Sequence, residues 1–265
     1  MLWEDLSTDR FPEMIKSSGG VCLLPIGVLE KHGNHLPVGT DMFTGRAVCE
    51  KASERETSLV FPYYFMGQIA EARHYAGAIA VSHRLMMDAL LELCDEIHRN
   101  GFKKIIVVSS HGGNNHFLPF FAQEMPRLNR AYNLYTIFIG NMKKEQERAI
   151  SEFAGTTDLG LHAGLVETST IMYLRPDLVR MDAQEGEEGR SLGRLEELRE
   201  KGVFTGFNWY AEYPRHIAGN PGPASAELGK MIFDMLCDNL VEVIRAVKAD
   251  DVSEKMKKEF NIGGE

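Results

Sequence analysis

The chain has 265 residues, of which 44% are hydrophobic and 25% are charged, and these values are typical of a globular protein with a sizeable core. A disordered or fibrous chain is therefore excluded. The formal net charge is −9, and the Lys and Arg residues are scattered along the sequence, so no basic stripe is available to bind a phosphate backbone. Nucleic acid is not an expected partner.

The sequence carries no sign of export or of a membrane segment. The first residues, MLWEDLSTDRF, contain acids where a signal peptide has a basic region, and the apolar runs are shorter than the roughly 20 residues that cross a bilayer as a helix. The four cysteines are widely spaced without a CxxC pair, which favours reduced, structural thiols. We therefore expect a cytoplasmic protein.

Hydrophobic periodicity predicts strands that alternate with helices. The predicted strands cover residues 20–28, 59–64, 103–109 and 134–139, and the predicted helices cover residues 42–55, 83–100, 114–129, 142–153, 166–174 and 224–247. This alternation favours parallel pairing with right-handed crossovers, and hence one α/β domain over residues 1–265 with helices on both sides of a mostly parallel sheet.

Two segments stand apart from this pattern. Residues 184–206 are dense in Gly and charge, and we interpret them either as an excursion such as a lid or an oligomerisation arm, or as a plain solvated helix with loops. Residues 248–265 form a charged tail that is free to fray.

The most informative segment is EKHGNHLPVGTD, residues 30–41, which directly follows the first predicted strand. Glu30 and His32 are two residues apart, so in an extended chain their side chains project from the same face. His35 and Asp41 follow in the same loop. Four potential ligands thus lie at the carboxyl end of a strand, where open α/β sheets bind their ligands. Imidazole and carboxylate donors without thiolates suit Zn²⁺, Mn²⁺ or Fe²⁺.

Two further segments carry candidate site residues. SSHGGNN, residues 109–115, follows another predicted strand and places His111 as a third metal-ligating imidazole. HAGLVETS, residues 162–169, contains His162 and Glu167. Five residues of helix correspond to a rotation of about 140°, so these two side chains cannot share one helical face. We predict that His162 precedes the helix and that Glu167 lies in its first turns.

Other catalytic schemes find little support. The sequence has no GxSxG elbow, no GxxxxGK[ST] loop and no GxGxxG after a strand, so no nucleotide cofactor is indicated, and no cysteine lies in a nucleophile motif. We interpret His35 as a residue that hydrogen-bonds within the loop or to a metal ligand, and a role as a ligand itself is the alternative. The five remaining histidines are interpreted as structural: His74, His83, His98, His116 and His216.

Taken together, these three segments and GNPGPAS at residues 219–225 resemble the creatininase (creatinine amidohydrolase) family over residues 22–246. The resemblance implies a three-layer α/β/α subunit, a homo-oligomer such as a hexamer, and a hydrolytic centre with two divalent metal ions. By position it implies that Asp41 bridges the two metals and that His162 transfers a proton. The implied metal ligands are Glu30, His32, Asp41, His111 and Glu167, of which Glu167 is also a catalytic acid.

The sequence departs from the creatinine-hydrolysing members at two places. Gly113 stands where those enzymes carry an acidic ligand, so Glu167 would have to take its place. Those enzymes also close the site with tryptophans from the region before the HAG motif, whereas the only tryptophans here are Trp3 and Trp209. Creatinine itself is therefore not the expected substrate.

The resemblance implies a metal-dependent hydrolase in which an activated water attacks the carbonyl of a small cyclic amide. The family also includes deformylases, mycofactocin peptide processing enzymes and a hydrolase that opens the ring of 3-dehydro-scyllo-inosose by C–C cleavage. The sequence does not choose among these substrates. A non-catalytic small-molecule-binding protein with a remnant site is the alternative from another class, and it would bind no metal after loading.

Overall fold

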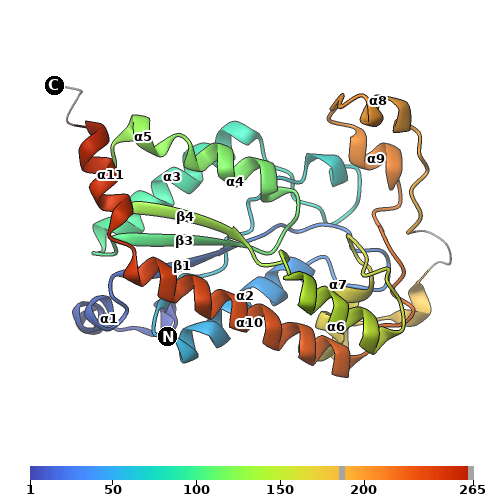
Figure 1. The fold of residues 1–265 in the computed structure, drawn as a ribbon, viewed down its shortest axis with the longest axis horizontal. Helices are drawn as coiled ribbons and strands as arrows, with labels where there is room; N and C mark the ends of the chain where they lie inside the picture. Colours follow the sequence, from blue (N-terminus) through green and yellow to red (C-terminus); the bar gives the residue numbers. More distant parts are fainter. Residues whose placement is uncertain (185–188, 262–265) are drawn as a thin grey trace.

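The computed structural model describes residues 1–184 and 189–261 (Figure 1). In these residues four strands form one parallel sheet in the order β2-β1-β3-β4. The strands are β1 (Val21–Ile26), β2 (Leu59–Val60), β3 (Lys104–Ser109) and β4 (Asn133–Phe138). Helical crossovers link them, as parallel pairing requires.

Helices cover both faces of the sheet (Figure 1). On one side lie α3 (His83–Arg99), α4 (Asn114–Ala122) and α5 (Met125–Leu128). On the other lie α2 (Thr40–Arg55), α6 (Lys144–Ala154), α7 (Leu165–Leu174) and α10 (Ala226–Ala249). Every residue of β1 is buried, which is typical of a parallel strand covered on both faces. The predicted three-layer α/β/α architecture is confirmed.

The alternation of side chains along the strands separates the two hydrophobic clusters that lie on opposite faces of the sheet. Leu23 and Ile106 pack in one cluster with apolar residues of α2 and α10. Leu24 and Ile105 pack in the other with α3, α4 and α1 (Phe11–Ser17).

The described residues also contain short 3₁₀ helices, which lie at Trp3–Asp5, Thr8–Arg10, Ala70–Ala72, Pro176–Leu178 and Met181–Ala183. No helix in the described residues is both long enough and apolar enough to cross a membrane.

The single helix predicted over residues 114–129 is wrong, because the structure has two helices there. The first, α4, ends at Ala122, and the second, α5, begins at Met125. The ring of Pro126 would clash with the carbonyl four residues earlier, which belongs to Ala122, so a continuous helix would be strained at this point. The predicted strand over residues 59–64 is also shorter, since only β2 and a single bridge from Tyr64 to Ile26 pair in it.

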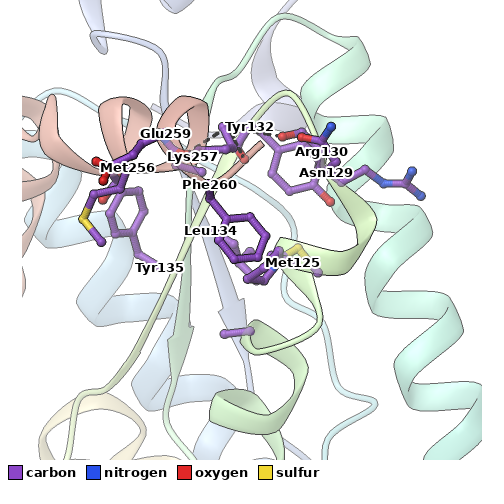
Figure 2. A pocket seen from close by; sticks show the side chains of 14 residues that line it. Met125, Asn129, Arg130, Tyr132, Leu134, Tyr135, Met256, Lys257, Glu259 and Phe260 are labelled. Atoms are coloured by element: carbon purple, nitrogen blue, oxygen red, sulfur yellow. Dashed lines mark hydrogen bonds between the residues drawn. The ribbon is translucent and has the colours of Figure 1, made fainter. Parts of the chain in front are cut away.

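The charged tail is ordered over most of its length. Residues 252–261 form the helix α11 (Val252–Asn261), and Lys257 donates hydrogen bonds to the carbonyls of Arg130 and Tyr132. Between α11, α5 and β4 lies a pocket of about 620 Å³, lined in part by Met125, Leu134 and Phe260 (Figure 2). This pocket lies near the amino end of β4. Residues 262–265 of the predicted tail lie outside the described residues.

The excursion predicted over residues 184–206 lies, apart from residues 185–188, within the described chain. It contains α8 (Glu196–Glu200) and extends past the predicted bound to α9 (Asn208–Glu212), so the name excursion is used below for residues 189–212. Both helices lie beyond the carboxyl ends of the strands (Figure 1). After α9 the chain reaches Ala218, which forms an isolated antiparallel bridge with His162. The segment that follows the excursion therefore lies beside His162, a candidate site residue.

Candidate metal centre

The parallel register brings two of the sequence motifs to one edge of the sheet. Ile26 at the end of β1 pairs with Ser109 at the end of β3, so the loops that follow the two strands start side by side. The hydroxyl of Ser110 donates to the carbonyl of Asp41, which ties the second loop to the first turn of α2. Thr40 and Asp41 begin α2 two residues earlier than predicted, and this places the Asp41 carboxylate at the edge of the sheet.

The third motif reaches the same edge from α7. Glu167 lies in the first turn of this helix and His162 precedes it, as predicted. His162 is fixed by hydrogen bonds that its backbone exchanges with Ala218, at 3.1 and 2.8 Å. The Glu167 carboxylate accepts a hydrogen bond from the backbone N–H of Ala163, which turns it back towards the loop before the helix.

Six predicted residues gather into three overlapping groups of potential ligand atoms. Within each group the donor atoms lie within 4.8 Å of one another. The groups are Glu30, Asp41 and His111; His32, Asp41 and Glu167; and Glu30, His32 and His162. Asp41 belongs to the first two groups, with Oδ2 3.3 Å from His111 and Oδ1 3.4 Å from His32. In this arrangement one carboxylate can offer an oxygen ligand to each of two cations.

Hydrogen bonds to backbone carbonyls fix which imidazole nitrogen faces the centre of the cluster. Nε2 of His111 donates to the carbonyl of Gln68 at 2.7 Å, so its Nδ1 lone pair faces Oε1 of Glu30 at 2.8 Å. Nδ1 of His32 donates to the carbonyl of Glu30 at 3.3 Å, so its Nε2 faces the carboxylates of Asp41 and Glu167. Metal-ligating histidines are oriented in this way.

The cluster leaves buried polar atoms without hydrogen bonds. Glu30, His32 and Asp41 are at most 2% exposed, and Oε1, Nε2 and Oδ2 of these three residues have no hydrogen-bond partner. Lone pairs of buried carboxylates and imidazoles that face one another repel unless a proton or a metal cation lies between them. A set of nitrogen and oxygen donors without thiolates suits a divalent ion such as Zn²⁺ or Mn²⁺. The residues present therefore fit a metal centre.

The electrostatics keep the acids of the cluster ionised. Burial by itself raises the pKa of the Glu30 carboxyl, but the adjacent imidazole of His111, whose own pKa is raised by Glu30 and Asp41, holds the Glu30 pKa well below its usual range. Burial likewise lowers the pKa of His32, but the neighbouring carboxylates, Glu167 first, raise it to about 9. Two buried carboxylates thus depend on positive charge beside them, and a bound cation supplies such charge.

His162 differs from the other two histidines because burial dominates its titration. It is 7% exposed, and burial lowers the pKa of its imidazole to about 4. Nε2 donates to the carbonyl of Lys31 at 2.8 Å, so Nδ1 is the unprotonated nitrogen, 3.9 Å from Oε2 of Glu167. The ring packs against His32 with the ring centroids 4.3 Å apart. His162 is therefore a neutral imidazole held at the edge of the cluster.

The space at Gly113 is closed by its neighbours. A Cβ atom at this position would lie 2.4 Å from Nε2 of His111 and 2.9 Å from the carbonyl oxygen of Gln68. A side chain here would break the hydrogen bond that orients His111. Glu167 approaches the cluster from α7 instead, with its side chain 29% exposed and Oε2 3.7 Å from Nε2 of His32.

Two other histidines touch the surroundings of the cluster. His35 is buried and its Nε2 lies 3.0 Å from the hydroxyl of Thr168, outside the three ligand groups, in agreement with its interpretation as a hydrogen-bonding residue of the loop. Sequence reasoning missed His216, which was placed among the structural histidines. Its Nε2 lies 2.7 Å from Oε2 of Glu30. The signal that could have singled it out is its position three residues before GNPGPAS, the fourth segment of the resemblance.

Comparison with known proteins identifies the family of this chain. The family model of creatininase, described as creatinine amidohydrolase, matches residues 4–244. Creatinine amidohydrolase of Pseudomonas putida is 23% identical, over 91% of this chain and 95% of that protein. A mycofactocin precursor peptide peptidase of Mycobacterium ulcerans is 28% identical, over 84% and 83% of the two chains. The 3-dehydro-scyllo-inosose hydrolase of Thermotoga maritima is 23% identical, over 85% and 76%.

The fold has solved counterparts as well. A structure described as "Creatininase Mn" superposes with a TM-score of 0.76 over 94% of this chain and 99% of that one, at 19% identity. This likeness confirms the fold, and the match of the family model over residues 4–244 confirms the predicted resemblance. The chain therefore belongs to the creatininase family.

Proposed function

We propose that this chain is a metal-dependent hydrolase that holds two divalent cations and cleaves the C–N bond of a small cyclic amide. One observation carries the proposal: three buried donor atoms without hydrogen bonds lie among acids and imidazoles whose orientation is already fixed. Glu30, Asp41 and His111 would hold one cation, and His32, Asp41 and Glu167 the other. When bound there, Zn²⁺, Mn²⁺ or Fe²⁺ supplies water activation and carbonyl polarisation.

The protein's own residues prepare this chemistry in two ways. Asp41 offers one oxygen to each ligand group, which fixes the spacing of the two positions. His162 presents an unprotonated Nδ1 at the edge of the cluster and keeps its Nε2–H on the carbonyl of Lys31. This nitrogen can accept a proton from the attacking water and return it to the leaving nitrogen, as general acid–base catalysis requires. Glu167, 3.9 Å from Nδ1 of His162, is placed to stabilise the imidazolium that forms between the two steps.

The substrate test compares cyclic amides with the substrate classes of other members of the family. The purified chain is loaded with Mn²⁺ or Zn²⁺ and incubated with cyclic amides, short peptides, formamides and inososes. We expect about two bound ions per chain and hydrolysis of a cyclic amide that stops in EDTA. Ring opening of an inosose would show that an inosose, and not a cyclic amide, is the substrate. Release of formate would likewise show that the substrate is a formamide. A chain that binds no ion after loading would refute the proposal.

We also propose that the protein is cytoplasmic and forms a homo-oligomer. The four free, buried cysteines support a reducing compartment. The excursion supports self-association, because Phe204 and Phe207 are 76% and 72% exposed there. Light scattering of the purified chain would give a mass that is a multiple of the subunit, and a monomer at all concentrations would contradict the proposal.

A further inference from the structure

The two oxygens of the Glu30 carboxylate have different partners. Oε1 faces the cluster and lies 2.8 Å from Nδ1 of His111. Oε2 accepts a hydrogen bond from Nε2 of His216 at 2.7 Å, and His216 itself is 3% exposed. Turning the carboxylate plane away from this orientation would break the bond from His216. His216 therefore stands outside the ligand groups but in direct contact with one of their acids.

A second hydrogen bond decides which nitrogen of His216 carries the proton. Nε1 of Trp209 donates to Nδ1 of His216 at 3.0 Å. An indole N–H is only a donor, so Nδ1 has to be the acceptor and is unprotonated. The proton of a neutral His216 then lies on Nε2, the nitrogen that faces Glu30. The indole thus sets the tautomer, and the tautomer sets the direction of the bond to the carboxylate.

The backbone of His216 is held in place from both sides. Its φ of 59° lies in the left-handed region, which a residue with a side chain adopts when surrounding contacts hold it there. Its N–H donates to the carbonyl of Tyr213 at 3.0 Å, and its carbonyl accepts from the N–H of Gly33 at 3.4 Å. The second bond joins the His216 segment to the loop that carries Glu30 and His32.

Trp209 connects the same network to the excursion. It lies in α9, and its ring meets the ring of His162 edge-on with centroids 5.7 Å apart. The ring of His216 also meets that of His162 edge-on, at 4.6 Å. The side chains of Trp209 and His216 thus fill the space behind both a predicted ligand, Glu30, and the predicted proton carrier.

We propose that His216 and Trp209 are positioning residues of the metal centre: Trp209 fixes His216 as the Nε2–H tautomer, and His216 holds Oε2 of Glu30 so that Oε1 faces the cations. This inference rests on the proposed function, because it assigns Glu30 as a ligand. Loss of an outer hydrogen-bond partner of a metal ligand lowers metal affinity by about 10–100-fold. The excursion, through Trp209, then contributes to the centre although it supplies no ligand.

The first test reads the tautomer of His216 directly. Two-bond ¹H–¹⁵N spectra of histidine-labelled protein, metal-free and loaded with Zn²⁺, distinguish a protonated Nε2 from a protonated Nδ1. We expect the Nε2–H pattern for His216 in the unmodified chain and in the control Trp3→Phe, and a mixture of tautomers in Trp209→Phe. Phe keeps the ring but lacks the indole N–H. An unchanged His216 pattern in Trp209→Phe would refute the role of the indole.

The second test measures the affinity for Zn²⁺ by competition with a chromophoric chelator. We expect His216→Leu to weaken binding by about 10–100-fold, and His216→Gln, which can still donate to Glu30, to restore part of the loss. His116→Gln is the control, because His116 contacts Phe204 of the excursion but no ligand. Equal affinities in His216→Leu and the unmodified chain would refute the positioning role of His216 but leave the proposed function in place. If the unmodified chain bound no Zn²⁺, the proposed function would also be refuted, whatever tautomer the spectra show.

Discussion

The substitution Asp41→Asn should remove the stability that bound metal gives to this protein. Asp41 is 2% exposed and is shared by two of the ligand groups. Asn keeps the shape of the side chain but removes its charge and one acceptor oxygen. Both cation positions therefore lose their common ligand, while the packing at the start of α2 is left in place.

The expected size of the effect follows from binding linkage. A ligand at 100 times its dissociation constant stabilises the folded state by about 2.7 kcal/mol, so two ions give about 5 kcal/mol. At roughly 2 °C per kcal/mol for a chain of this length, metal should raise the unfolding temperature by about 10 °C. If Asp41→Asn weakens each site about 100-fold, the same metal concentration adds only about 0.4 kcal/mol per site, or a total shift of about 2 °C.

The assay is thermal unfolding followed by circular dichroism, with EDTA or with saturating Mn²⁺ or Zn²⁺. The unfolding temperature of the metal-free variant shows whether it folds. Asp88→Asn is the matched control, because Asp88 is an exposed aspartate of α3 whose side chain lies outside the ligand groups. A metal-induced shift in Asp41→Asn as large as that of the unmodified chain would show that Asp41 does not bridge the cations.

Three further predictions follow from the same structure. Glu167→Gln should bind about one ion per chain, because only one of the two proposed cation positions contains Glu167; two ions retained at unchanged affinity would exclude Glu167 as a ligand. His162→Ala should keep its metal but lose about 10²–10⁴-fold in turnover, and loss of metal would instead make His162 a ligand. Gly229→Ala should lower the free energy of unfolding in urea by about 1–3 kcal/mol, because its Cβ would lie 1.8 Å from the carbonyl oxygen of Ser169 in α7. The control Gly206→Ala meets open space and should change the free energy of unfolding by less than about 0.5 kcal/mol.

Much of the candidate site could be predicted from local sequence because its residues follow predicted strands. Glu30 and His32 follow β1, and His111 follows β3, and parallel strands bring their carboxyl ends to one edge. Spacing alone also placed His162 before its helix and Glu167 within it. These inferences needed only the direction of the strands and the geometry of a helix.

The contacts of His216 could not be predicted in this way. Its partner Glu30 lies 186 residues earlier in the chain, and the contact depends on a loop with a left-handed residue rather than on a periodic element. The break between α4 and α5 was missed for a different reason, since the apolar pattern continues through it; α4 accommodates Pro119, whereas the chain begins a new helix around Pro126. Long-range loop contacts and single steric clashes leave little trace in hydrophobic periodicity.

The central claim is that the buried acids and imidazoles at the edge of the sheet form a two-metal centre. The most direct measurement is the metal content of the purified chain by mass spectrometry after loading with Mn²⁺ or Zn²⁺ and removal of free ions. We predict about two ions per chain, and fewer in Asp41→Asn. A folded, unmodified chain that retains no ion, or an Asp41→Asn variant that retains both, would contradict the account.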